Sequence, residues 1–246
     1  MKKILVGIAL LSTTILAEQP QTIGIAASYT NSMYQSKGQF IPIPLINLHY
    51  NDFYVKGLKI GYNLYEEDNF QFGAIINPLG GYFDGWTIKS KDMKNGYKNI
   101  KDRKSQFMYG VETSYMFDEN VMGNISYLWG SKGSTGKAEL TYIKELNDRL
   151  IIMPSINFKY YNKKYLNYYI GVSKDEVTKN EKISKEYKTN DSFTAGVNLT
   201  VEYRITEQTT ASIFGGYDYF DKKIKNSPIV NKKGQAYGGI GIRYSF

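Results

Sequence analysis

Apolar and polar residues alternate with a period of two along much of this chain. Between residues 193 and 205 the odd positions are all apolar or aromatic, and the even positions are Thr194, Gly196, Asn198, Thr200, Glu202 and Arg204. A helix has 3.6 residues per turn and cannot separate this pattern into two faces, whereas a strand with one wet face can. The pattern therefore predicts β-strands that are apolar on one side and polar on the other.

The same alternation predicts about twelve strands, within a range of about ten to fourteen. They cover residues 22–30, 42–50, 53–65, 69–79, 105–117, 120–130, 136–146, 149–161, 165–172, 191–205, 207–220 and 235–246. No segment after the N-terminus approaches the ~20 apolar residues of a spanning helix, whereas a spanning strand needs only ~9–11 residues. We therefore predict an all-β fold, a transmembrane antiparallel up-and-down β-barrel.

Both ends of the chain indicate export to the outer membrane. Residues 1–17 combine a basic start, an apolar run from Ile4 to Leu16 and the small residue Ala17, which is typical of a cleaved signal peptide. Residues 18–246 would then form the barrel. The last strand alternates as far as Phe246, and a terminal aromatic strand with Tyr244 and Phe246 is expected to be the signal read by the barrel assembly machinery.

The connections between the predicted strands leave one question open. Counted backward from the C-terminus, the connections alternate between short and long, as periplasmic turns and external loops should. The same count places the long connection 80–104 on the periplasmic side. Either this segment is a periplasmic excursion, or a strand is divided wrongly, at 165–172 or around Gly57.

Composition narrows the chemistry that this protein can carry out. The chain has no Cys, so disulfides, thiolate catalysis and cysteine metal sites are excluded. Its net charge of +8 falls to +6 if Lys2 and Lys3 leave with the signal peptide. An exported barrel does not meet nucleic acid, so the expected anions are lipopolysaccharide phosphates, anionic solutes and murein partners, beside the outer-membrane lipid around the barrel. Alternatively, the lysines only keep external loops solvated.

Aromatic residues gather near the ends of the predicted strands. They are Tyr54, Tyr65, Tyr115, Phe117, Trp129, Tyr160, Tyr161, Tyr219 and Phe220. Such positions favour girdles at the two membrane interfaces, although a carbohydrate platform could use the same residues.

Charged residues occupy the polar face of several strands and would therefore point into the lumen. The predicted network consists of Lys59, Glu112, Lys159, Glu202, Arg204, Asp218 and Arg243, with Glu139 and His49 on the same side. An unpaired charge in a narrow barrel is costly, which favours a plug of ion pairs. A selectivity filter for anionic or zwitterionic solutes would use the same side chains, and a twelve-stranded barrel is compatible with either.

No motif supports catalysis or metal binding. His49 is the only histidine, and a hydrolase would need a nucleophile and an acidic partner that converge on it. One His without Cys leaves only carboxylates without ligand spacing for a metal. We therefore expect no enzymatic activity, no cofactor and no metal site.

Several segments resemble, in order, the MipA/OmpV family of outer-membrane proteins. They are 42–50 with its two prolines, Phe53–Val55, 57–64 with Gly57 and Gly61, Val111–Thr113, Tyr168–Val172, Asn226–Val230 and the ending Tyr244–Phe246. Each motif is weak alone, but together they span nearly the whole mature chain. One departure is the segment 80–86, which leads into a basic stretch where the family often carries an acidic run.

The resemblance implies a location and a role rather than a catalytic site. It implies an outer-membrane protein that acts as a non-enzymatic scaffold between a murein hydrolase and a murein synthase. The β-barrel fold alone does not establish that scaffold role. The alternative function is a narrow, porin-like channel for small solutes.

Overall fold

The computed structural model describes residues 20–231 and 234–246, so the predicted signal peptide lies outside the described residues. The strands are β1 (Thr22–Thr30), β2 (Gln39–Tyr50), β3 (Phe53–Lys56), β4 (Lys59–Glu67), β5 (Phe70–Gly80), β6 (Gln106–Met116), β7 (Val121–Gly130), β8 (Gly133–Tyr142), β9 (Lys144–Asn147), β10 (Leu150–Tyr161), β11 (Ser192–Arg204), β12 (Thr209–Phe220) and β13 (Gln235–Ser245). The helical segments are η1 (Ser90–Asp92), α1 (Lys163–Tyr169), α2 (Lys174–Thr178) and α3 (Lys222–Lys225).

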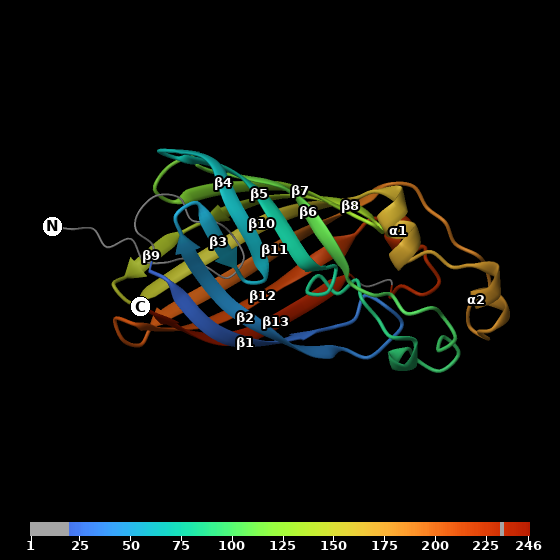
Figure 1. The fold of residues 1–246 in the computed structure, drawn as a ribbon. Helices are drawn as coiled ribbons and strands as arrows, with labels where there is room; N and C mark the ends of the chain where they lie inside the picture. Colours follow the sequence, from blue (N-terminus) through green and yellow to red (C-terminus); the bar gives the residue numbers. More distant parts are fainter. Residues whose placement is uncertain (1–19, 232–233) are drawn as a thin grey trace.

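The strands close into a twelve-stranded antiparallel barrel (Figure 1). Each strand pairs with its neighbour in the sequence, and β9 continues β8 against β10. The circle closes where β13 pairs with β1, with Ile242 opposite Ile25. Closure joins the first strand to the last, so the sheet does not end in a free first or last strand. The predicted fold class is confirmed.

Two of the predicted strands are wrong, and the errors cancel in the count. The segment 53–65 is two strands, because Gly57 adopts a left-handed φ of 61° and turns the chain between β3 and β4. The segment 165–172 overlaps helix α1, whose first turn is capped by the Asn162 side chain accepting from the Tyr165 amide at 2.9 Å. With both corrected, the long connection 81–105 lies at the same end as the other long loops.

The two faces of the wall follow the predicted alternation. Ile213 and Ile240 are 65% and 64% exposed on the outside, while polar residues such as Ser212 are buried on the inside. Five of the predicted girdle residues are exposed, namely Tyr65, Tyr115, Phe117, Trp129 and Tyr219. The girdle prediction is wrong for Tyr54, Tyr161 and Phe220, which are buried inside because each lies on the inward-facing parity of its strand.

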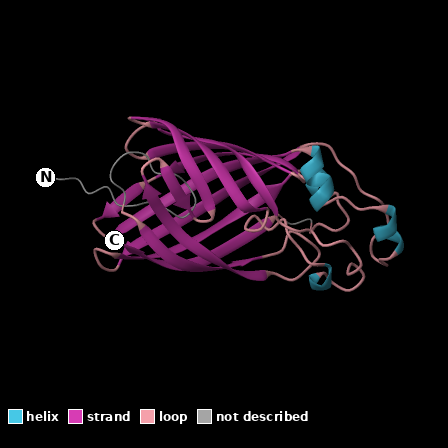
Figure 2. Cartoon of the chain, in the orientation of Figure 1, coloured by secondary structure: helices cyan, strands magenta, loops and turns pink. Residues whose placement is uncertain are grey.

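The long loops and all helices gather at one end of the barrel, which we call the cap (Figures 1 and 2). The cap comprises residues 31–38, 81–105, 162–191 and 221–231, and we assign it to the external side because periplasmic turns are short. No helix of the described residues is long and apolar enough to cross a membrane.

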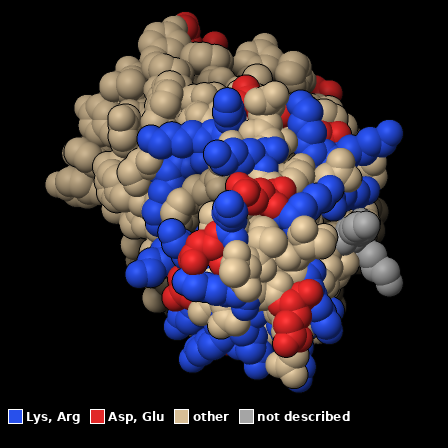
Figure 3. Space-filling view, turned by 90° about the vertical axis from the view of Figure 1, so that its right-hand side faces the viewer, with Lys and Arg blue, Asp and Glu red and all other residues tan. Residues whose placement is uncertain are grey.

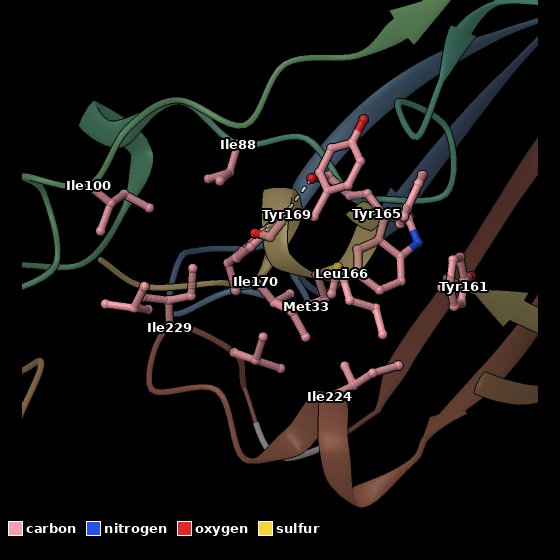
Figure 4. Packing of buried hydrophobic residues seen from close by; sticks show 14 of the residues in the cluster. Met33, Ile88, Ile100, Tyr161, Tyr165, Leu166, Tyr169, Ile170, Ile224 and Ile229 are labelled. Carbon is pink, nitrogen blue, oxygen red and sulfur yellow. Dashed lines mark hydrogen bonds between the residues drawn. The ribbon is translucent and has the colours of Figure 1, made fainter. Parts of the chain in front are cut away.

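The cap has its own hydrophobic core (Figure 4). Trp86 packs against the rings of Tyr161, Tyr165 and Tyr169 at centroid distances of 4.5, 5.3 and 5.9 Å. The buried Tyr34 hydroxyl lies 2.6 Å from the Trp86 carbonyl and 3.1 Å from the Tyr169 carbonyl. Four separate loops and the ends of several strands contribute to this cluster, so it ties them across the barrel mouth.

Candidate functional site: the lumen and its outer mouth

Six of the seven predicted lumen charges form ion pairs in the structure. The pairs are Lys59–Glu112, Lys159–Asp218 and Arg243–Glu202. Each joins two strands that are separated by a third, so the side chains reach over an intervening strand. Alternation identified the inward side chains, but only the closed wall decides which of them meet.

The pair nearest the periplasmic end is the most deeply buried. Glu202 and Arg243 have side-chain exposures of 1% and 4%. The guanidinium binds the carboxylate through both amino groups, with Nη2 at 2.7 Å from Oε2. Such a bidentate arrangement is the strongest geometry available to these groups. Ser212 of β12 lies between the two strands, and its small side chain leaves room for the contact.

The pair near the outer end needs a glycine. Lys159 Nζ donates to Asp218 Oδ2 at 2.9 Å, and the strand between them is β11. Gly196 of β11 lies directly opposite Asp218, and a β-carbon there would collide with the carboxylate. Any larger residue at this position would therefore push Asp218 away from Lys159.

The third ion pair and several other polar side chains also face the lumen. Glu112 of β6 pairs with Lys59 of β4 across the intervening strand β5. Lys137 pairs with Glu139 on the same strand at 2.9 Å. His49 hydrogen-bonds to Asn47, with Nε2 and Oδ1 3.0 Å apart.

Arg204 is the exception in the predicted network. It ends β11, and its amide donates to the Arg149 carbonyl at the periplasmic rim. Among the described residues no carboxylate comes within ion-pair distance of its guanidinium. Its position at the open end of the lumen explains this, because bulk water solvates the charge there.

A short segment of the cap loop 81–105 folds into the outer mouth of the barrel. Asp84 Oδ1 lies 3.8 Å from Lys159 Nζ of β10, and Gly85 lies against the Gln235 side chain of β13. Next to it lies a cavity of about 20 Å³, lined by Thr30, Ser32, Gln39, Ile41, Tyr82, Gly85, Thr87 and Gln235. A cavity of this size holds about one water molecule. Residues 80–86 are rich in glycine and aromatic residues, which marks this segment in the sequence. Nothing in that composition predicts that the segment enters the barrel mouth.

An ion pair outside the membrane fastens two cap loops. Arg103 Nη2 donates to Glu176 Oε1 at 2.9 Å, and the Ser173 and Lys101 amides donate to the same carboxylate. Burial raises the pKa of Glu176, but these hydrogen bonds and the Arg103 charge outweigh it and lower the pKa. The carboxylate is therefore held in its charged form.

The predicted assembly residues lie at the seam of the barrel. Tyr244 and Phe246 are exposed on the outside, and the Phe246 amide donates to the Gln21 carbonyl at 3.0 Å. The seam is where the last strand meets the first. Their role as an assembly signal stays a prediction.

Within residues 20–231 and 234–246 no group of three His, Cys, Asp or Glu side chains could hold a metal ion.

The family model of MltA-interacting protein MipA matches residues 23–246, nearly the whole chain that forms the barrel. This chain belongs to the MipA family. The "24 kDa outer membrane protein" of Pasteurella multocida is 31% identical over 91% of this chain and 90% of its own length. The family resemblance seen in the ordered motifs is therefore confirmed, and this MipA-family chain is an outer-membrane β-barrel protein.

Two further likenesses bear on the family's role and fold. The "MltA-interacting protein" of Escherichia coli (strain K12) is 26% identical over 83% of this chain and 81% of its own length. The solved NanC porin superposes with a TM-score of 0.50 at 9% identity, covering 91% of this chain and all of that one. At that identity the porin shows a shared fold only.

Proposed function

We propose that this MipA-family protein is a closed, non-enzymatic barrel that acts as a scaffold for the murein machinery at the inner side of the outer membrane. The observation that carries the proposal is the packed core of the cap, which spans the outer mouth above an ion-paired lumen. A channel needs a continuous water path, and the rings of Trp86, Tyr165 and Tyr169 occupy the place where that path would leave the barrel.

The lumen charges support a structural role. In each of the three ion pairs the two charges lie within bonding distance and compensate each other, so they attract a solute in the lumen only weakly. A selectivity filter works differently, because its charges must bind an ion and then release it.

The partner would meet the periplasmic rim, since murein lies on that side. The rim consists of the short turns 51–52, 68–69, 117–120, 148–149 and 205–208. Exposed acids dominate it, namely Asp52, Glu66, Glu67, Asp68, Asp118, Glu119, Glu145, Asp148 and Glu207. We take the partner to be a murein hydrolase of the kind named in the E. coli relative, together with a murein synthase. The barrel assembly machinery and lipopolysaccharide are further proposed partners.

Conductance across a planar lipid bilayer tests the closed barrel. We expect no stepwise openings from the intact protein at neutral pH. A variant in which residues 81–87 are replaced by a short Gly-Ser turn should open, because it loses both Asp84 and Trp86 from the mouth. Stepwise openings from the intact protein would overturn the closed barrel and favour the narrow channel.

Retention of a purified lytic transglycosylase tests the scaffold. The protein in lipid nanodiscs should retain the enzyme, and Asp118→Lys with Glu119→Lys should weaken retention. The matched control, Lys174→Glu with Lys185→Glu in the cap, should leave it unchanged. If neither the transglycosylase nor a murein synthase binds the intact protein, the scaffold role is wrong.

A further inference from the structure

The wall of the barrel is incomplete in its outer half between β2 and β5. The hairpin between them is short, so β3 pairs with β2 only at residues 47–50 and β4 pairs with β5 only as far as Ile76. Residues 39–45 of β2 and 77–80 of β5 have no strand beside these edges within the described chain. We call this the wall gap.

Prolines mark both edges of the wall gap. The Ile46 carbonyl accepts from the Gly57 amide at 2.7 Å, so the backbone groups of Ile46 point toward the hairpin. Every second residue of a strand points the same way, which directs positions 42 and 44 into the gap. Both are proline and have no N–H, and Pro78 is exposed on the opposite edge. A strand with missing donors is a poor template for another strand, so a polypeptide is a poor occupant.

Behind the gap the inner surface is apolar. Ile41, Ile43 and Leu45 point inward from β2, and Ile75 points inward from β5. Inward apolar residues also occur elsewhere in the wall, such as Met108 of β6 and Met153 of β10, among the ion pairs and buried hydroxyls and amides.

The wall gap opens at the depth of the outer leaflet. Phe40, beside its upper end, is 79% exposed and packs against Tyr29 at 5.0 Å, as an aromatic pair at the outer interface would. Below it, the outward residues Pro42, Pro44 and Ile46 are apolar. The gap therefore faces acyl chains and not solvent.

Two basic loops join directly above the gap. The Lys94 amide donates to the Gln35 carbonyl at 2.8 Å, and Ser36 and Met93 form a β-bridge. These loop segments expose Lys37, Lys89, Lys91 and Lys94, and the nearby acids are Asp92 and Asp102, whose carboxylate accepts from the Ser90 amide at 2.7 Å. Figure 3 shows lysines crowding this end of the molecule. Anionic groups at the membrane surface would be attracted there.

We propose that the wall gap and the lysines above it form a binding site for one lipopolysaccharide molecule. An acyl chain of its lipid A would lie along this unpaired edge against the outward residues Pro42, Pro44 and Ile46, and its phosphates would meet Lys37, Lys91 and Lys94. Lipopolysaccharide is the choice because the gap lies in the external half of the wall, next to a cluster of cations. The site does not depend on the murein role.

Photo-crosslinking in intact outer membranes tests the site. A benzoylphenylalanine replaces Phe40 at the gap or, as the matched control, Phe158, an exposed phenylalanine in the outer half of the continuous wall. We expect a lipopolysaccharide adduct at position 40, severalfold stronger than at position 158. Equal adducts at both positions, or adducts with phospholipid alone, would overturn the proposal.

Charge variants test the head-group contacts in the same assay. Each of Lys37→Gln, Lys91→Gln and Lys94→Gln should lower the adduct at position 40 by about fivefold, since a lysine near an anionic surface contributes about 1 kcal/mol. The control set Lys164→Gln, Lys174→Gln and Lys185→Gln has the same charge change elsewhere in the cap and should have no effect. If both sets lower the adduct equally, the lysines act only as general charge and the assigned site is wrong. Conductance and transglycosylase retention should not change in either set.

Discussion

The two ends of this barrel are built on different principles. At the external end, loops from four parts of the chain pack into a buried cluster around Trp86, and lysines cover the surface. At the periplasmic end the turns are short and acidic, and the small apolar cluster is Met122, Ile143, Ile151 and Met153. The external end thus resembles a small soluble layer with its own core, whereas the periplasmic end is only the edge of the wall.

This contrast separates two sources of stability. The wall is stabilised by its backbone ladder, by lipid on the outside and by ion pairs inside. The cap is stabilised by apolar burial, like a water-soluble domain. A change at one end should therefore leave the other end intact, and the following experiments test that independence from the largest expected effect to the smallest.

Removing Arg243 should damage the wall most. Arg243→Ala leaves the buried Glu202 carboxylate without its partner, which should lower the free energy of unfolding by about 3–5 kcal/mol. Urea unfolding from lipid vesicles, followed by heat-modifiable gel mobility, measures this loss. The control Arg204→Ala removes an arginine at the rim with no ion pair and should cost less than about 1 kcal/mol. Equal losses would mean that the buried pair is no more important than a solvated charge.

Removing a large side chain from the cap core should destabilise only the external end of the barrel. Trp86→Ala removes the ring that joins Tyr161, Tyr165 and Tyr169, at a cost of about 3–5 kcal/mol to the folded cap. Protease added to whole cells should then cleave the external loops, while gel mobility of the barrel stays normal. The control Tyr82→Ala trims an exposed ring nearby and should resist cleavage like the parent. Loss of the barrel in Trp86→Ala would show that cap and wall are one cooperative unit.

A charge on the lipid face should cost the wall less than a broken buried pair. Val197 is 57% exposed at the centre of β11, so Val197→Arg should cost about 2–4 kcal/mol on refolding into lipid. Asn198 points inward, where its amide donates to the Ser155 hydroxyl at 3.0 Å. Asn198→Arg should lack the lipid penalty, although crowding can still destabilise it. Better tolerance of Val197→Arg than of Asn198→Arg would contradict the assigned register.

Acid should loosen the cap before the wall through Glu176. The pKa of this group is lowered in the folded cap, so its contribution is present above the ordinary glutamate pKa of 4.5 and is lost as pH falls through the lower, folded value. External proteolysis should therefore increase below about pH 4.5. Glu176→Gln should flatten this dependence while lowering cap stability at neutral pH. An unchanged pH profile in that variant would assign the acid sensitivity to other groups.

The smallest effect on the folded protein is expected at Phe246. Its ring is exposed at the seam, so deleting it should barely change unfolding of barrels that have already formed. Assembly should suffer instead, with unassembled protein open to periplasmic proteolysis. Ser245→Ala is the neighbouring control and should assemble normally. Normal assembly of the deletion would mean that the terminal aromatic strand is not the signal read by the assembly machinery.

The sequence predicted the wall well because one local rule governs it. A strand in a barrel wall meets lipid on one side and the lumen on the other, so residues such as Val197 and Asn198 report their faces directly. The two wrongly predicted strands, 53–65 and 165–172, lie where this alternation between lipid-facing and lumen-facing residues does not hold. Gly57 reverses the chain inside an apparently continuous alternation, and α1 carries tyrosines at a helical spacing that passes for a short strand.

The sequence by itself determined the compartment, the fold class and the side of the wall on which each charge lies. The closed tertiary structure alone decided that Lys159 meets Asp218 and Arg243 meets Glu202, because those partners come from strands far apart in the chain. It also decided that residues 81–87 enter the mouth and that the wall is open between β2 and β5. Long-range contacts leave no periodic trace in a single sequence, whereas the environment of each strand face does.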